Sequence, residues 1–294
     1  MNTPERSTSG RPVERVAVLG AGTMGHGIAQ VAASVGCRVT LFDVDSAAAT
    51  RGVERIAANL DKGVSLGKVE PEARDATLSR VETGTDLSDA VRDADLVIEA
   101  APESMEIKSG LFRTVEEAAD ADAILASNTS SLSIEELADV LGRPERFLGL
   151  HFFNPVHIMG LVEIVYGNRT SPQTLERAVA FVERLGKEPV VVRDSPGFAS
   201  SRLGVALGLE AMRMLEEGVA DAKSIDRAME LGYRHPMGPL RLTDLVGLDV
   251  RLGIAEYLHE KLGSERFRPP EILRRMVAEG KLGKKSGEGF YRWD

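Results

Sequence analysis

The chain has 294 residues, with 36 lysine and arginine residues against 45 aspartate and glutamate residues, which gives a formal net charge of −9. At about 150 residues per domain this length suggests two domains. A hydrophobic fraction of 43% supports packed cores, so a mainly disordered chain is excluded. The acidic balance argues against a nucleic acid or an anionic membrane as partner, because each favours a basic face. A phosphorylated ligand is not excluded, since it needs only local positive charge or a helix N-terminus.

Residues 1–12 are rich in Ser, Thr, Pro and Gly and contain no apolar segment, which predicts a disordered tail rather than a signal peptide. No apolar run approaches the roughly 20 residues that span a bilayer. The single cysteine, Cys37, excludes an internal disulfide framework and is typical of a reducing compartment. We therefore expect a cytoplasmic protein without a membrane partner.

After the tail, short β-branched runs alternate with helical patterns. An apolar run at 16–19 stops at Gly20, helical spacing covers 24–35, and a strand follows at 38–43. Later strands are expected at 96–99, 123–126, 146–153, 161–166 and 188–192, later helices at 105–119 and 134–141, and a helical excursion between Asp45 and Pro71. This alternation predicts an α/β domain over 13–193, with a doubly wound parallel sheet and helices on both faces.

The pattern changes at the segment 194–197, Asp-Ser-Pro-Gly. Beyond it only helical patterns follow, at 203–217, 223–231, 241–262 and 270–279. Because Pro-Gly is a strong breaker, we place a domain boundary near Asp194 and expect an all-helical domain over 194–294. Met and Leu recur there at three- and four-residue spacing, which fits either a domain core or a subunit interface.

A glycine loop follows the first strand and opens the first helix: Gly20-Ala-Gly22-Thr-Met-Gly25. In the dinucleotide fingerprint these glycines make the tight turn, admit a pyrophosphate to the backbone N–H groups and allow close helix packing. Asp43 ends the second strand 23 residues after Gly20, where an acid receives a ribose hydroxyl and repels a 2′-phosphate. The combination predicts NAD rather than NADP. The alternative is a structural turn beside a solvated aspartate.

A polar loop, Ser127-Asn128-Thr-Ser130-Ser131, directly follows the strand at 123–126. Open α/β sheets bind ligands beyond the carboxyl ends of their strands, so Asn128 and Ser130 are candidates to face a ligand. The alternative is a helix N-cap cluster, with Ser133 as the cap. The two interpretations are compatible.

A second polar segment, His151-Phe-Phe-Asn154-Pro, ends one strand, and Glu163 lies inside the next apolar strand. Consecutive strands are usually neighbours, so the imidazole and the carboxylate could meet. A carboxylate fixes the tautomer of an imidazole and raises its basicity, which removal of an alcohol proton requires. His157 competes for this role but has no strand-borne partner, and a structural histidine is the alternative.

These residues resemble the L-3-hydroxyacyl-CoA dehydrogenases, including the bacterial 3-hydroxybutyryl-CoA dehydrogenases. The matching segments run in order from Arg15 to Tyr291: the glycine loop at 20–25, Asp43, Val-Ile-Glu-Ala at 97–100, the serine loop at 127–131, His-Phe-Phe-Asn-Pro at 151–155, Leu-Val-Glu at 161–163 and Gly-Lys-Lys-Ser-Gly-Glu-Gly-Phe-Tyr at 283–291. The resemblance implies a Rossmann-type NAD-binding domain and a helical C-terminal domain that makes most of a homodimer.

The resemblance also implies roles for single residues. His151 is the general base, Glu163 is its electrostatic partner, and Ser130 hydrogen-bonds the substrate hydroxyl. Residues implied to bind NAD are Gly20, Gly22, Thr23, Met24, Gly25, Asp43, Glu103, Lys108 and Asn128. Residues implied to contact the acyl-CoA substrate are Ser130, Asn154, Ser201, Lys62 and Lys68. No metal is expected.

Three departures from the family pattern concern the substrate. Ser201 stands where the family often has Asn, and its shorter side chain favours a contact through water. The loop at 157–160 reads His-Ile-Met-Gly, where many members have Pro and Lys at its two ends. The lysine-rich helix that usually helps to hold CoA is reduced to Lys62 and Lys68.

The leading hypothesis is reversible, NAD-dependent oxidation of an L-3-hydroxyacyl-CoA to the 3-oxoacyl-CoA. One alternative is a dehydrogenase of a free hydroxy acid or sugar acid, as in lens-crystallin-like relatives, which the thin lysine set motivates. A non-catalytic NAD-binding scaffold is a second alternative, although it would need only the glycine loop and Asp43. Fatty-acid β-oxidation, butanoate or polyester metabolism and aromatic degradation all use the leading reaction, and the sequence does not choose among them.

Overall fold

The computed structural model describes residues 11–293 and divides into two compact units. The first unit ends at Asp194 and the second begins at Ser195. Most of the expected N-terminal tail, residues 1–10, lies outside the described residues. Arg11, the first described residue, pairs through Nε with Oδ1 of Asp95 at 3.2 Å.

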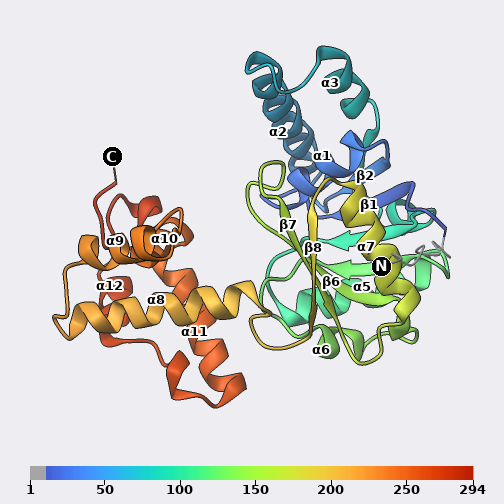
Figure 1. Cartoon of the computed structure of the whole chain (residues 1–294). Helices are drawn as coiled ribbons and strands as arrows, with labels where there is room; N and C mark the ends of the chain where they lie inside the picture. The colour runs from blue at the N-terminus through green and yellow to red at the C-terminus, as the bar shows by residue number, and fades with distance from the viewer. Residues whose placement is uncertain (1–10, 294) are drawn as a thin grey trace, which may run out of the picture. The chain divides into compact units, whose positions relative to one another are not determined.

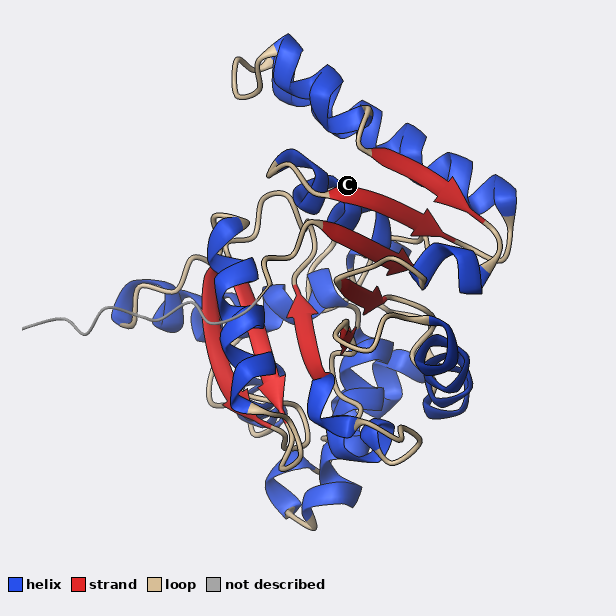
Figure 2. Ribbon diagram, turned by 90° about the vertical axis from the view of Figure 1, so that its right-hand side faces the viewer, coloured by secondary structure: helices blue, strands red, loops and turns tan. Residues whose placement is uncertain are grey.

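The first unit is built on one eight-stranded sheet with the strand order β3-β2-β1-β4-β5-β6-β7-β8 (Figure 1). The strands are β1 (Arg15–Leu19), β2 (Arg38–Phe42), β3 (Val81–Gly84), β4 (Leu96–Glu99), β5 (Ile124–Ser127), β6 (Phe147–Phe152), β7 (Leu161–Tyr166) and β8 (Glu188–Arg193). The helices are α1 (Gly25–Ser34), α2 (Ser46–Ser65), α3 (Pro71–Leu78), α4 (Leu87–Val91), α5 (Met105–Ala118), α6 (Ile134–Ala138) and α7 (Pro172–Arg184). Helices cover both faces of the twisted sheet (Figure 2).

The central strands β4, β5 and β6 are buried along their whole length. Near-continuous apolar runs are typical of parallel strands with both faces covered. These strands can therefore be recognised in the sequence as short apolar runs between helical segments. Strands β1 to β6 all pair in parallel, so their carboxyl ends lie along one edge of the sheet. The loops that follow β1, β4, β5 and β6 therefore gather at that edge, which we call the carboxyl edge.

The sheet departs from the expected parallel arrangement at one end. β7 runs antiparallel to β6, and β8 then pairs in parallel with β7. The reason is the short connection after Phe152, because a loop of this length returns the chain directly and cannot make the crossover that a parallel pair needs. The sequence pattern also does not predict β3, α3, α4 and α7. β3 has four residues, none of them fully buried, so its hydrophobic pattern is weak.

The second unit is helical, as expected. It contains α8 (Ser200–Glu216), α9 (Ala222–Gly232), α10 (Pro239–Val246), α11 (Leu248–Leu262) and α12 (Glu271–Ala278). The single helix expected over 241–262 is wrong, because Gly247 adopts a φ of 104° and separates α10 from α11. Buried apolar side chains from α8 to α12 form its core, among them Leu209, Met212 and Leu258.

The buried carboxylate of Asp244, on α10, holds the C-terminal segment in place through hydrogen bonds. Its two oxygens accept hydrogen bonds from the backbone of Phe290 and Tyr291, both at 2.9 Å, and from Nε1 of Trp293 at 2.8 Å. Asp226 similarly accepts a bond from the Tyr291 hydroxyl at 2.7 Å. Across residues 11–293 no helix is long and apolar enough to cross a membrane.

Candidate active site

The glycine loop connects β1 to α1 at the carboxyl edge. Gly20 has a φ of 105°, and a Cβ there would lie 2.7 Å from the Ala100 carbonyl oxygen. A Cβ on Gly25 would lie 1.7 Å from the Gly20 carbonyl oxygen, so the helix can begin this close to the loop only with glycine. At Gly22 a Cβ would meet nothing within 4 Å. The exposed Gly22 backbone thus leaves room for a pyrophosphate, and the residues present fit a dinucleotide.

Asp43 lies beside this loop, at the end of β2. Its Oδ2 accepts a hydrogen bond from the Ala21 N–H at 2.9 Å, and its Oδ1 accepts one from the Asp45 N–H at 3.1 Å. These bonds hold the half-buried carboxylate against the glycine loop. A carboxylate in this position can accept bonds from a ribose and repels a 2′-phosphate.

A buried ion pair lies beneath the loops that follow β4 and β5. Nζ of Lys108, on α5, is 2.6 Å from Oε1 of Glu99, and the two side chains are 1% and 0% exposed. The second Glu99 oxygen accepts a bond from the Ser127 hydroxyl at 2.6 Å. Burial raises the pKa of the Glu99 carboxyl, although the Lys108 ammonium and the hydrogen bonds oppose this rise. Glu99 therefore joins α5 to the end of β5.

Glu103 extends this arrangement to the serine loop. Its Oε2 lies 3.3 Å from Nζ of Lys108, and its Oε1 accepts bonds from the Thr129 hydroxyl at 2.5 Å and the Ser130 N–H at 3.0 Å. We call Glu99, Glu103 and Lys108 the charge network. Through it, the two loops that contain the predicted NAD-binding and substrate-binding residues are held together.

Asn128 connects the serine loop to β6. Its Oδ1 accepts a hydrogen bond from the Phe152 N–H at 2.9 Å, directly after His151 in the chain. The same bond fixes the Asn128 side-chain amide in one orientation. Ser133 occupies the N-cap of α6, where its hydroxyl accepts a bond from the Glu136 N–H at 3.2 Å.

His151 and Glu163 face each other across the antiparallel pair β6–β7. Nδ1 of His151 is 2.8 Å from Oε2 of Glu163, and the side chains are 8% and 1% exposed. A carboxylate oxygen accepts the bond, so the proton lies on Nδ1 and the lone pair of the neutral ring lies on Nε2. The ring centroids of His151 and Phe153 are 4.4 Å apart. The pair is therefore a buried, oriented acceptor for a proton.

The remaining predicted site residues lie in several elements. Ser130 is half-buried in the serine loop, and Asn154 is exposed just after β6. Lys62 lies in the last turn of α2 and Lys68 in the turn that follows, both exposed. Ser201 lies in the first turn of α8, in the second unit, and its contact with a substrate stays a prediction.

The sequence did not identify Glu99, which belongs to the charge network, or Ser127, which donates a hydrogen bond to it, as site residues. Glu99 and Ser127 both end buried strands, and neither was assigned a role. The sequence does contain a sign of this role for Glu99. It ends the apolar run 96–99, and a carboxylate at the end of a buried strand needs a partner. The sequence did not identify that partner, since Lys108 lies one helix turn inside an amphipathic helix, where a solvated lysine is the ordinary expectation.

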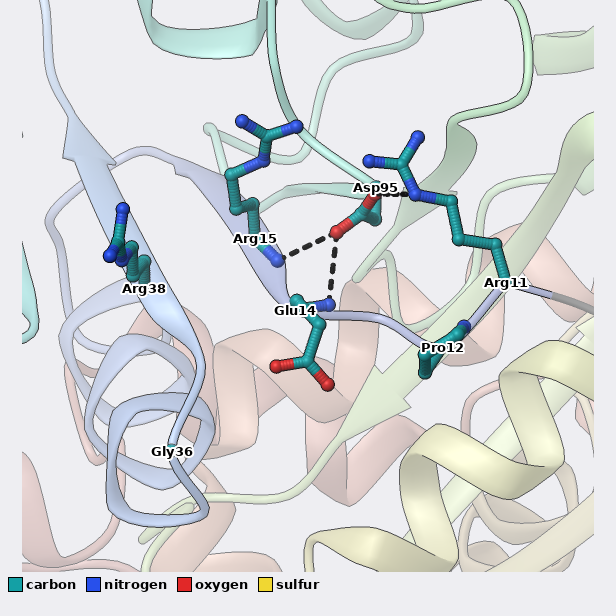
Figure 3. Close-up of a pocket in the computed structure, with 7 residues that line it drawn as sticks. All are labelled: Arg11, Pro12, Glu14, Arg15, Gly36, Arg38 and Asp95. Carbon is teal, nitrogen blue, oxygen red and sulfur yellow. Dashed lines mark hydrogen bonds and ion pairs between the residues drawn. The ribbon is translucent and has the colours of Figure 1, made fainter.

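A cavity of about 420 Å³ lies away from the carboxyl edge (Figure 3). It is lined by Arg11, Pro12, Glu14, Arg15, Gly36, Arg38 and Asp95. Arg15 and Arg38 begin β1 and β2, so this cavity lies at the amino ends of the strands. It is separate from the glycine loop and the His151–Glu163 pair. Among the described residues, no group of three or more His, Cys, Asp or Glu side chains is placed to hold a metal ion.

Two family models match the chain in order. The NAD binding domain of 3-hydroxyacyl-CoA dehydrogenase matches residues 15–195, and the C-terminal domain of the same family matches residues 197–293. The chain belongs to the 3-hydroxyacyl-CoA dehydrogenase family. The resemblance inferred from the motifs and the Rossmann-type fold are thereby confirmed.

Individual relatives agree with this membership. A probable 3-hydroxybutyryl-CoA dehydrogenase of Deinococcus radiodurans is 46% identical over 276 residues, which cover 94% of this chain and 99% of the relative. The mitochondrial hydroxyacyl-coenzyme A dehydrogenase of Sus scrofa is 45% identical, with 96% and 91% covered. The crystal structure of (S)-3-hydroxybutyryl-CoA dehydrogenase PaaH1 from Ralstonia eutropha superposes with a TM-score of 0.93 at 40% identity, covering 96% of this chain and 99% of that chain.

Proposed function

We propose that this protein catalyses the reversible, NAD-dependent oxidation of L-3-hydroxyacyl-CoA to 3-oxoacyl-CoA. The observation that carries the proposal is the buried His151–Glu163 pair, 2.8 Å apart, at the same sheet edge as the glycine loop. Membership of the 3-hydroxyacyl-CoA dehydrogenase family and the names of the relatives support the same reaction. A free hydroxy acid as substrate has no comparable support.

His151 removes the proton of the 3-hydroxyl group. Glu163 holds Nδ1–H, which leaves the Nε2 lone pair to accept that proton. As C3 loses hydride, the C3–O bond becomes a carbonyl, and the new imidazolium is stabilised by the buried Glu163 carboxylate. In the reverse direction the same Nε2–H returns the proton to the carbonyl oxygen. Ser130 and Asn154 orient the oxygen and the thioester.

NAD supplies the hydride acceptor when it is bound. Gly22 leaves the space for its pyrophosphate, and Gly20 and Gly25 allow the tight turn and the close start of α1. Thr23 and Met24 lie just before α1, and Asp43 would accept bonds from the ribose. Asn128 and Glu103 line the cofactor side of the serine loop. Lys108 acts on the cofactor through Glu103, because its own Nζ is paired with the carboxylates of Glu99 and Glu103.

The second unit is proposed to form a homodimer. α10 carries an exposed apolar stripe, Leu242, Leu245 and Val246, whose side chains are 39%, 41% and 40% exposed and lie three and four residues apart. Such a stripe on a helix surface is suited to burial against a second copy. Leu245→Asp should convert the dimer to a monomer in analytical ultracentrifugation. A wild-type protein that sediments as a monomer at micromolar concentration would contradict this assignment.

We further propose a cytoplasmic location and a role in fatty-acid β-oxidation. The buried thiol of Cys37, which is not in a disulfide, is compatible with a reducing compartment. The reaction itself, oxidation at the third carbon of an acyl thioester, is a step that β-oxidation requires.

The function is tested by following NADH oxidation with acetoacetyl-CoA, with NADPH and free acetoacetate as the comparison substrates. We expect turnover with NADH and the thioester, and little with NADPH or the free acid. His151→Ala should abolish most of the turnover while NADH binding is retained. Near-normal turnover of His151→Ala, or a preference for the free acid, would contradict the proposal.

A further inference from the structure

Arg251, on α11, places a cation in the interior of the second unit. The residue is 5% exposed and shares its helix face with the buried residues Leu248, Ala255 and Leu258. Its Nε is enclosed and has no hydrogen-bond partner. A charge is buried at a large cost in free energy unless it is paired.

The second unit supplies no counter-charge to this guanidinium. Burial alone lowers the pKa of Arg251 to about 10, which leaves the side chain cationic at neutral pH. The acids that flank it in sequence are engaged elsewhere, because Asp249 accepts a bond from Nζ of Lys285 at 2.6 Å and Asp244 holds the C-terminal segment. Within residues 11–293, no acidic side chain forms an ion pair with Arg251. An anionic ligand would offset the cost of this unpaired charge.

Arg251 lies opposite Gly204 of α8, since α8 and α11 pack on each other (Figure 1). Nη1 of Arg251 is 3.4 Å from the point that a Cβ on Gly204 would occupy, and no other described atom outside the adjoining backbone of α8 lies within 4 Å of that point. The two helices run in opposite directions, because Leu258, seven residues after Arg251, contacts the corresponding point at Gly197, seven residues before Gly204. Gly204 is half-buried, so the missing side chain leaves space beside Nη1 at the surface of α8.

This space lies next to the predicted substrate contact of the second unit. Ser201 precedes Gly204 by three residues on α8, so the two residues share one helix face. The residues that the family resemblance assigns to CoA, Lys62 and Lys68, lie in the first unit. An anion at Arg251 is therefore assigned to the acyl portion of the substrate rather than to the phosphates of CoA.

We propose that Arg251 binds a carboxylate at the far end of the acyl chain, so that the preferred substrates are CoA thioesters of dicarboxylic acids. This proposal rests on the proposed function, which supplies an acyl-CoA substrate. A guanidinium presents its N–H donors in a planar fork that matches the two oxygens of a carboxylate. Arg251 thereby determines specificity and takes no part in the chemistry at C3.

The test compares thioesters of matched chain length: 3-oxoadipyl-CoA with 3-oxohexanoyl-CoA, and 3-oxosuberyl-CoA with 3-oxooctanoyl-CoA. In the wild type, kcat/KM with NADH should be at least about tenfold higher for the carboxylated member of one pair. Arg251→Met should lose this preference through a higher KM for the carboxylated substrate, with kcat little changed, because the carboxylate is remote from the reacting carbon. Arg251→Lys keeps the charge and should retain part of the preference. Arg275→Met, at an exposed position of α12, is the matched control and should behave as the wild type does.

Two further measurements separate ligand binding from a structural role of Arg251. Isothermal titration calorimetry with adipyl-CoA and hexanoyl-CoA requires no turnover, because these thioesters lack the 3-oxo group, and it should show the same dependence on Arg251. Without ligand, Arg251→Met should unfold at the same temperature as the wild type or at a higher one, because an apolar side chain of similar length replaces an uncompensated buried charge.

A wild-type protein without a preference for the carboxylated member of either pair would overturn the proposal, as would an unchanged preference in Arg251→Met. A lower unfolding temperature of Arg251→Met would also overturn it, because another part of the protein or a second copy would then supply the counter-charge. Binding of free adipate that depends on Arg251, without a preference between the thioesters, would assign the guanidinium to a separate ligand and reject the acyl-chain carboxylate. A wild-type protein that reduces none of these thioesters would refute the proposed function, and the calorimetry would still decide the role of Arg251.

Discussion

The charge network predicts a specific stability phenotype for Lys108→Met. The substitution keeps the length of the side chain but removes the ammonium that lies 2.6 Å from Oε1 of Glu99. Both side chains are almost completely buried, so the variant leaves a carboxylate without its counter-charge in the interior. Removing one partner of a buried ion pair costs about 3–5 kcal/mol of unfolding free energy.

The cost should depend on pH in a defined direction. Burial already raises the pKa of Glu99 above its ordinary value of 4.5, and loss of Lys108 removes the largest opposing effect. The folded variant therefore takes up a proton at a higher pH than the unfolded chain does. The destabilisation should be fully present at pH 8 and smaller at pH 5.5, because protonation neutralises the buried carboxylate.

Equilibrium urea unfolding, followed by circular dichroism at both pH values, measures this effect. The double variant Glu99→Gln/Lys108→Met removes both charges and should recover most of the lost stability, since neutral replacement of a buried pair is often harmless. Lys281→Met is the control, because Lys281 pairs with Glu279 and Glu288 at the exposed surface and should give no measurable change. A double variant no more stable than Lys108→Met, or a loss that is the same at pH 8 and pH 5.5, would refute the reasoning.

Three further outcomes are expected. Glu163→Gln should lower kcat about tenfold with little change in KM, because a neutral partner replaces a charge-assisted hydrogen bond; initial rates with acetoacetyl-CoA measure this, and an unchanged kcat would contradict it. Asp43→Asn should lower the preference for NADH over NADPH about tenfold in kcat/KM, whereas an unaltered preference would place cofactor selection elsewhere. Gly25→Ala should weaken NADH binding in a fluorescence titration, because the new Cβ would lie 1.7 Å from the Gly20 carbonyl oxygen, while Gly110→Ala, with open space around its Cβ, should bind as the wild type does.

Strand positions and fold class were predictable where patterning is strong. β4 and β5 each begin with three apolar residues, and the glycine loop and Asp43 mark the ends of β1 and β2, so local composition was sufficient. The break at Gly247 was not predictable, because helical periodicity continues on both sides of this glycine and its φ of 104° leaves no mark in the sequence pattern.

The candidate site was likewise predictable only in part. His151 and Glu163 were predicted as a possible pair because consecutive strands with a short connection are usually neighbours. The role of Glu99 was not predicted, because it depends on Lys108 reaching back from the next helix to a strand end, a contact with no sequence period.

The antiparallel pairing of β6 with β7 makes the alignment of His151 with Glu163 independent of the loop between the two strands. His151 and Glu163 are aligned by the backbone ladder, and a slip of one residue would turn Glu163 to the opposite face of the sheet. The segment between the strands does not set this alignment. It can change in sequence, and even in length, while the proton-transfer pair keeps its geometry. Substitutions in this loop should therefore leave the distance between Nδ1 of His151 and Oε2 of Glu163 unchanged.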